Sequence, residues 1–367
     1  MKIINKALKF IIFLIFGILI FQVLTYIFVP KWTDQEDPAT GRIRGYYKED
    51  TNTIDVLAIG ASSVGKGYSP IEVWNKYGIT SYNLGTSNQT MSFAYYLIKE
   101  AINYQSIKVV VLDMDTIFSE TNAPEGEYRK LFDNMKLGKV KIEAINDKNL
   151  KIEDKDKLSY VFPLLRFHTR FQDIKNIDFK YLLNDENENL SYKGMAITVG
   201  VKPYIDNERY MEEKNDEGPV ISDENLYYTN EIIKLCKDEN IKLIFMTIPS
   251  ATSGPIGKQV LDWSLNKNRQ VEELANKNEI EFIDFNLPGI QKEIGFDWLK
   301  DSSDCGNHLN VYGAEKVSNY IGKILSEEYN VPDHRNDKEI SNKWNEIAKK
   351  YQERKTKMEK KLADNKK

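Results

Sequence analysis

Cysteine and histidine are scarce in this chain of 367 residues, which contains two cysteines and three histidines. Two cysteines cannot form a disulfide framework, and Cys236 and Cys305 do not have the spacing of metal ligands. With so few histidines, the sequence offers no ligand set for a structural zinc ion. We therefore expect neither a metal site nor a cofactor.

Positive charge is depleted in the middle of the chain. The net charge is −4; the amino-terminal lysines supply three positive charges and residues 343–367 a net six, which leaves −13 for the residues between them. An acidic body argues against a nucleic-acid partner. We expect the basic end to be a solvated, partly helical tail, and contact with anionic lipid or an anionic wall polymer is the alternative.

Charge is absent altogether from residues 10–29, "FIIFLIFGILIFQVLTYIFV". Twenty residues at 1.5 Å each span about 30 Å, the hydrocarbon thickness of a bilayer. The run is apolar on all sides, unlike a core helix with one polar face, and no small-residue cleavage site follows it. We expect a single membrane anchor. Because Lys2, Lys6 and Lys9 precede it, the amino terminus should be cytoplasmic and the rest extracytoplasmic.

Beyond the anchor, short apolar runs alternate with helical patterns. This alternation is typical of a parallel sheet with helices on both faces, so we expect a three-layer α/β/α fold. The expected strands are 53–60, 107–115, 241–249 and 280–285, and the clearest helices are 92–105, 227–240, 268–278 and 311–329.

The alternation is interrupted over residues 122–225, a stretch too long to be a bare loop. We expect it to be an inserted subdomain over the carboxyl edge of the sheet, where ligands usually bind in this class. The predicted organisation is an anchor at 1–30, a linker at 31–52, a main α/β domain at 53–330 that contains the insertion, and a charged tail at 331–367.

The first expected strand ends by presenting hydroxyl groups. Gly60 closes its apolar run, and Ser62 and Ser63 follow almost at once. A serine at this place faces the crevice at the carboxyl edge of the sheet. Its hydroxyl is a weak nucleophile and needs a neighbouring base.

His308 is the best candidate for that base. It lies in "DSSDCGNHLN", directly before the last helix of the domain. Asp304, four residues earlier, is close enough to orient its imidazole, and Asp301 is a second candidate for that task. An aspartate and a histidine before a helix are equally well explained as capping groups. The preceding serine on the first strand favours the catalytic interpretation.

A third polar segment, "YNLGTSNQT" at 82–90, precedes a helix. Gly85 allows close backbone approach, and its N–H together with that of Ser62 is a candidate oxyanion hole. Asn88 or Gln89 is a candidate side-chain donor. The alternative is an ordinary strand-to-helix turn with a polar cap.

These three segments, in this order, resemble the SGNH (GDSL-type) hydrolase superfamily. The matching residues are Gly60-Ala61-Ser62 for the serine block, Gly85 for the glycine block, and Asp304 with His308 for the last block. The resemblance implies that Ser62 is the nucleophile, His308 the base and Asp304 its orienting partner. Three features depart from the family: Ala61 replaces its aspartate, the last block is one residue longer, and its asparagine block is not evident, so that Gln89 is a candidate replacement.

The membrane anchor narrows the resemblance. A short cytoplasmic end, one span and an outward SGNH domain are similar to the branch that acylates cell-surface polymers, including the alginate acetylation proteins and the protein that completes D-alanylation of lipoteichoic acid. The resemblance implies transfer of an acyl group, expected to be acetyl, to a cell-envelope glycan, beside a multi-pass membrane acyltransferase that supplies it. The alternatives are an esterase acting on the same glycans and an inactive scaffold that binds polymer.

The segment "PLLRFHTRF" in the insertion carries cationic side chains between apolar ones. Its His168 and Arg170, with Asn88 of the earlier segment, are weak candidates for contact with an anionic or sugar acceptor. A solvated face of the insertion explains Arg166, His168 and Arg170 equally well.

Overall fold

The central element of the computed structural model is a five-stranded parallel sheet in the order β2-β1-β3-β4-β5. The structure describes residues 2–30, 39–121, 123–176, 178–179, 192–203, 219–250 and 257–365. The strands are β1 (Val56–Ile59), β2 (Ser81–Asn83), β3 (Val109–Asp113), β4 (Lys242–Thr247) and β5 (Glu281–Asp284).

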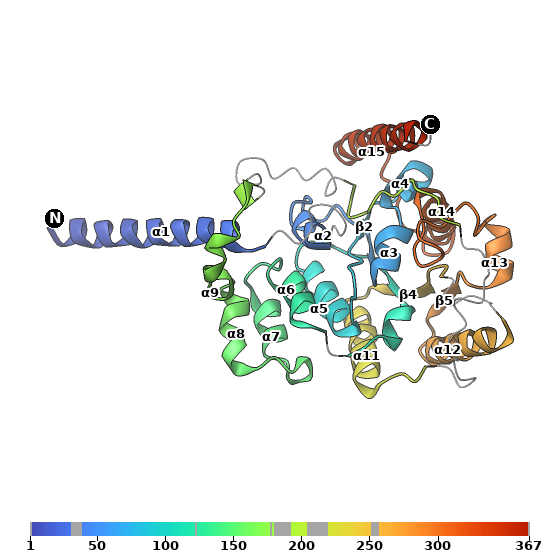
Figure 1. The fold of residues 1–367 in the computed structure, drawn as a ribbon, viewed down its shortest axis with the longest axis horizontal. Coiled ribbons are helices and arrows are strands. Elements are labelled where there is room, and N and C mark those ends of the chain that lie inside the picture. The colour runs from blue at the N-terminus through green and yellow to red at the C-terminus, as the bar shows by residue number, and fades with distance from the viewer. Residues whose placement is uncertain are drawn as a thin grey trace.

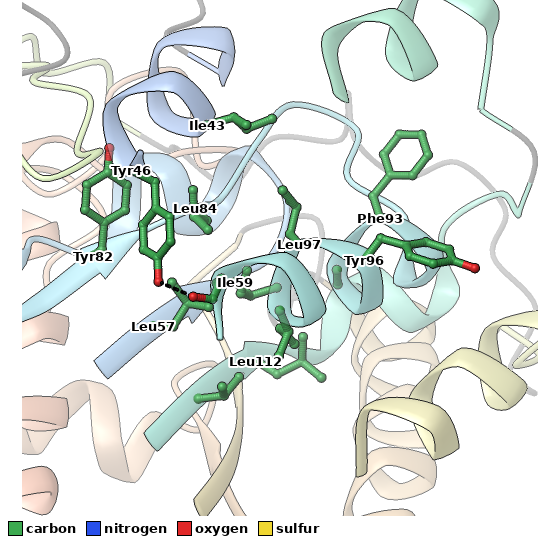
Figure 2. Close-up of a cluster of buried hydrophobic side chains, with 14 of the residues drawn as sticks. Ile43, Tyr46, Leu57, Ile59, Tyr82, Leu84, Phe93, Tyr96, Leu97 and Leu112 are labelled. Atoms are coloured by element: carbon green, nitrogen blue, oxygen red, sulfur yellow. Dashed lines mark hydrogen bonds between the residues drawn. The ribbon is translucent and has the colours of Figure 1, made fainter. Parts of the chain in front are cut away.

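Both faces of the sheet are buried, because alternate residues of each strand point to opposite sides. On one face, Leu57, Ile59 and Leu112 pack against Phe93 and Leu97 of α5 (Met91–Ala101), as Figure 2 shows. The other face belongs to a separate cluster that includes residues of α3 (Ser62–Gly67) and α14 (Val311–Glu327). The predicted α/β fold with a covered parallel sheet is confirmed.

The other helices of the described residues complete these layers and extend beyond them (Figure 1). They are α1 (Lys2–Phe28), α2 (Ala39–Tyr46), α4 (Pro70–Tyr77), η1 (Met114–Phe118), α6 (Glu125–Phe132), α7 (Lys139–Ile145), η2 (Lys148–Leu150), α8 (Asp154–Val161), α9 (Leu164–Phe167), η3 (His168–Gln172), α11 (Asp223–Asp238), α12 (Gly257–Lys277), α13 (Pro288–Glu293) and α15 (Lys338–Asp364).

Helix α1 projects away from the rest of the molecule (Figure 1). Residues 6–28 are long and apolar enough to cross a membrane, and the rest of the chain does not bury their apolar window. By length and composition, such a helix is either a membrane span or a signal sequence.

The insertion divides into two described parts. Helices α6 to α9 and η3 gather at the end of the body from which α1 projects, with α7 against α5 and α9 against α1 (Figure 1). The second part, residues 192–203, runs beside the carboxyl edge of the sheet: the Ala196 N–H donates to the Gly65 carbonyl, and the Val311 N–H donates to the Thr198 carbonyl. We expected the whole insertion to lie over the carboxyl edge of the sheet, and of its described residues only this second part does.

The segment expected to be a linker is partly core. Within the described residues 39–52, helix α2 buries Arg42, Ile43 and Tyr46. The Tyr46 hydroxyl donates to the Ala101 carbonyl at the end of α5, and its ring meets Tyr82 edge-on (Figure 2). The described part of the segment therefore packs into the α/β body.

The carboxyl-terminal end differs from the expected solvated tail. It forms the 27-residue helix α15, which docks through two buried aromatic residues. Trp344 stacks on Trp74 of α4 with ring centroids 5.2 Å apart, and Tyr351 meets Tyr192 at 5.8 Å. Lys343, Lys349 and Lys350 of α15 are exposed, whereas Lys355 pairs with Glu315 of α14 at 3.7 Å.

Candidate active site

The turn after β1 is shaped by close packing at Gly60. A β-carbon at this position would lie 2.4 Å from the β-carbon of Asp113, so only glycine fits. Two residues later Ser62 begins α3, with Ala61 as its N-cap. The strand therefore delivers the Ser62 side chain to the carboxyl edge of the sheet.

Three side chains meet there in a continuous hydrogen-bonded chain. Ser62 Oγ lies 2.8 Å from His308 Nε2. His308 Nδ1 is hydrogen-bonded to Asp304 Oδ2, and the His308 backbone N–H donates to Asp304 Oδ1 at 2.6 Å. The three residues expected to act together are therefore placed together.

Local backbone geometry holds the Asp304–His308 pair. Cys305 (φ +63°) and Gly306 (φ +96°) turn the chain through the left-handed region, which brings residues four apart face to face. A bridge between Ser302 and Leu309 closes the loop, and Asn310 caps α14 through bonds to the N–H groups of Tyr312 and Gly313. The loop is a pre-formed turn rather than an extended linker.

The electrostatics of the pair define the imidazole tautomer. Partial burial raises the pKa of Asp304, but its hydrogen bonds with His308 and the nearby charge of Lys66 outweigh this effect and leave the pKa below its usual range. An ionised carboxylate only accepts, so Nδ1 carries the proton and Nε2 offers a lone pair to the Ser62 hydroxyl. Such a serine can attack a carbonyl carbon.

Asp304, not Asp301, is the carboxylate that contacts His308. Asp301 is buried, accepts the Asp297 N–H at 2.6 Å and pairs with Lys316 at 2.7 Å. The other two histidines are engaged elsewhere: His168 Nδ1 lies 2.9 Å from the Leu165 carbonyl, and His334 Nε2 lies 2.6 Å from Asp55.

Two of the expected oxyanion donors are already engaged, which corrects the sequence-based assignment. The Gly85 N–H donates to Asn83 Oδ1 at 2.9 Å. The Gln89 amide donates to the Leu84 carbonyl and to Thr86 Oγ1, both at 2.9 Å. These residues stabilise the loop after β2 instead of presenting free N–H groups. Of the expected donors, only the Ser62 N–H remains, in the first turn of α3, where backbone N–H groups have no intrahelical acceptor.

The weaker substrate-contact candidates also have structural partners. Asn88 is exposed and donates to Glu127 at 3.3 Å. Arg170 donates to the Ile27 and Phe28 carbonyls at the end of α1 and forms a two-pronged pair with the buried carboxylate of Asp178. Arg170 and His168 therefore belong to the junction between α1 and the insertion, where we see no contact with the Ser62 site.

The sequence reasoning missed a second hydrogen-bonded pair beside Ser62. Ser63 Oγ donates to Asp113 Oδ2 at 2.7 Å, and Asp113 ends β3 in full burial. Burial, with a smaller effect of the Asp115 charge, raises the pKa of Asp113 above its usual range. Asp115 pairs with Lys267. The signal available in the sequence was the acidic end of the second apolar run, "VLDMD".

Arg42 was also missed, although it links the segments that form the site. Its guanidinium is buried and donates to the carbonyls of Gly65 in α3, Gly85 after β2 and Gly194 in the insertion. A β-carbon on Gly65 would lie 2.6 Å from Arg42 Nη1. One buried cation thus fixes three separate parts of the chain behind the Ser62 turn.

Among the described residues, no cluster of three or more His, Cys, Asp or Glu side chains is arranged to hold a metal ion. The site is built from a hydroxyl, an imidazole and a carboxylate.

No protein-family model matches the chain, and no curated protein matches it. Among solved structures, similarity is found to a protein described as an acylhydrolase from Bacteroides fragilis, with a TM-score of 0.36, 12% identity, and coverage of 81% of this chain and 98% of that one. A GDSL-like lipase from Bacteroides thetaiotaomicron has the same TM-score and identity, with 78% and 98% covered. Likeness at this level assigns no activity.

Proposed function

We propose that this chain is a membrane-anchored serine acyltransferase of SGNH type that moves an acyl group, expected to be acetyl, to a cell-envelope glycan. The observation that carries the proposal is the hydrogen-bonded chain from Ser62 Oγ through His308 to Asp304. Its residues match the serine block and the Asp–His block of the SGNH superfamily. The α/β fold has the parallel sheet that the superfamily requires.

In the first half-reaction, Ser62 Oγ attacks the acyl carbonyl carbon while its proton passes to His308 Nε2. The tetrahedral intermediate collapses, the donor's alcohol or thiol leaves with that proton, and an ester remains on Ser62. In the second half-reaction, His308 takes a proton from a hydroxyl of the acceptor, whose oxygen attacks the ester. Ser62 regains a proton and the acceptor carries the acyl group. Asp304 keeps the imidazole in one orientation and stabilises its charged form.

The oxyanion that develops on the acyl carbonyl needs hydrogen-bond donors. Of the donors predicted from the sequence, we propose only the Ser62 backbone N–H for this role. A single oxyanion donor typically contributes a factor of about 10² to 10³ in rate. Gly85 and Gln89 do not enter the mechanism.

The anchor gives the proposed reaction its location. Arg170 caps the last carbonyls of α1, and Phe162 packs on Phe21 with ring centroids 6.0 Å apart. These contacts favour a membrane span that is retained over a signal sequence that is removed, because cleavage after α1 would remove residues that pack against the insertion. We propose a cytoplasmic amino terminus, an extracytoplasmic body and a multi-pass acyltransferase as donor, to which a tether supplies high effective concentration.

A carbohydrate esterase is the second candidate, favoured by the partial exposure of the His308 side chain, 22%, which lets water reach the base. The two activities share the first half-reaction. They are separated by incubating the enzyme with an activated acetyl ester and a glycan oligomer and comparing acetylated glycan with free acetate.

The test of the shared chemistry is turnover of p-nitrophenyl acetate by the purified full-length protein. We expect Ser62→Ala to abolish the burst and turnover, and we expect Ser63→Ala, the matched neighbour, to retain both at reduced rate. Equal turnover by the Ser62→Ala protein and the wild type would reject the proposal. An inactive polymer-binding scaffold would show no turnover in any variant.

A further inference from the structure

Exposed apolar side chains are concentrated on the insertion. Within the described residues, twelve large apolar side chains outside α1 are exposed, and seven of these lie between residues 137 and 179. Soluble surfaces carry such residues singly, whereas a gathering of them marks an interaction site. The seven are Leu137, Ile142, Leu158, Phe162, Leu165, Phe171 and Phe179.

Four of these residues lie on segments that adjoin α1, and we call them the insertion face: Leu137, Phe162, Leu165 and Phe171. Leu137 and Phe162 line a groove shared with α1. Leu165 lies on α9 and Phe171 on η3, and both of these helices contact α1. The segments that carry the insertion face therefore lie beside the end of α1 that joins the body (Figure 1).

The junction between α1 and the insertion is fixed rather than hinged. Arg170 donates to the Phe28 carbonyl at 3.0 Å and to Asp178 at 2.8 Å, and the Asp178 side chain is fully buried. Phe162 meets Phe21 edge-on. Because polar and apolar contacts both cross the junction, the insertion face keeps a constant position relative to the α1 axis.

The groove between the two elements measures about 620 Å³. One wall consists of α1 residues from Phe13 to Tyr26 together with Val29, and the insertion wall includes Leu137, Val161 and Phe162. If α1 crosses the membrane, much of the first wall lies at the depth of lipid chains. The groove then opens directly onto hydrocarbon.

We propose that the insertion face is a second membrane-binding element, which lies in the interfacial layer of the leaflet from which α1 emerges, with acyl chains of bilayer lipids occupying the groove. The occupant is lipid because one wall of the groove is the membrane span itself, which acyl chains surround. Burial of apolar surface supplies the attraction. The pairing of Lys155, Lys157 and Arg166 with nearby carboxylates limits the attraction of these three side chains to anionic headgroups.

Attachment through both α1 and the insertion face fixes the orientation of the body to the bilayer, which α1 alone does not. A lone span lets the body rotate and tilt on its connection, whereas a span plus an interfacial face holds the sheet, and with it the Ser62 edge, in one orientation to the bilayer. The inference rests on α1 crossing the membrane and is independent of the serine chemistry.

The test uses the full-length protein in protein-free liposomes of phosphatidylcholine and phosphatidylglycerol. In a Cys305→Gly background, which the φ of +63° at this position accommodates, a cysteine replaces Phe171, Leu299 or Phe16 and carries an environment-sensitive fluorophore. The remaining native cysteine, Cys236, is buried and therefore protected from labelling. Phe171 and Leu299 are matched in exposure, 62% and 58%, so neither exchange disturbs the core. Quenching by lipids with a spin label near the headgroup reports contact with the interface.

We expect the probe at 171 to be quenched several-fold more than the probe at 299, with no change when the salt concentration is raised. Equal quenching at 171 and 299, with a probe at 16 quenched by deep spin labels, would overturn the proposal while leaving the anchor intact. Absence of quenching at 16 would overturn the anchor and the proposal together. Turnover of p-nitrophenyl acetate is measured separately and decides neither result.

Discussion

Ser62 Oγ and His308 Nε2 lie 2.8 Å apart, although the two residues are separated by 246 positions in the chain. The contact exists because β1 and the loop before α14 end at the same rim of the sheet. Parallel strands place their carboxyl ends on one side, and loops from distant parts of the sequence gather there. The proposed chemistry depends on this contact.

Replacing Asp304 with asparagine tests the orientation of His308. The amide cannot stabilise the imidazolium and permits the wrong tautomer, so we expect turnover of an activated ester to fall by about 10² to 10⁴. Steady-state kinetics of the purified variant measures the loss.

Asp301→Asn is the matched control for Asp304→Asn. It removes the charge that pairs with Lys316, so we expect lower thermal stability but an unchanged rate per folded molecule. A larger rate loss for Asp301→Asn than for Asp304→Asn would reverse the assignment of the carboxylate.

Asp113→Asn tests the buried carboxyl beneath the nucleophile turn. Because burial raises the pKa of Asp113 in the folded protein, the folded state holds a proton that the unfolded state has lost between the two pKa values. Stability conferred by this group is therefore full below the unfolded pKa and declines as the pH rises toward the folded one. We expect the asparagine variant to lose less stability than the wild type between mildly acidic and neutral pH.

Thermal unfolding of Asp113→Asn across that pH range measures the difference. Ser63→Ala removes the hydrogen bond to Asp113 but keeps the carboxyl, so it should preserve the decline. Parallel pH profiles for the wild type and the Asp113→Asn protein would show that Asp113 does not titrate as inferred.

Arg42→Met tests the link between three segments. The change keeps an unbranched side chain but leaves the Gly65, Gly85 and Gly194 carbonyls without their charged donor, a loss on the order of 3 kcal/mol or more. We expect a lower midpoint of thermal unfolding and reduced turnover. Arg269→Met on the exposed face of α12 is the control, because its pair with Glu273 is long, at 3.9 Å, and solvated. Equal effects of the two substitutions would contradict the role of Arg42.

The sequence was informative for the Asp304–His308 pair and for the turn that carries Ser62. Asp304 and His308 are four apart, so their contact follows from a single turn, and Ser62 follows an apolar strand whose carboxyl end must face the crevice. The strand pattern also predicted the parallel sheet, because buried strands read as continuous apolar runs.

The sequence was uninformative where a partner lay far along the chain. Nothing near Gly85 indicates that Arg42, 43 positions earlier, binds its carbonyl. Likewise, the lysines around Trp344 and Tyr351 suggested solvent, although these two rings dock α15 on α4 and on Tyr192. Arg170 resembled a substrate contact because its real partner, the end of α1, is more than a hundred residues away.

Covalent labelling at Ser62 is the most direct test of the acyl-enzyme proposal. A serine-directed fluorophosphonate is incubated with the full-length protein, and the modified peptide is identified by mass spectrometry. We predict one adduct, on Ser62, which is lost in His308→Ala and retained in Arg269→Met. A wild-type protein that stays unmodified, or that carries the adduct on Ser63 with Ser62 free, would contradict the proposed chemistry.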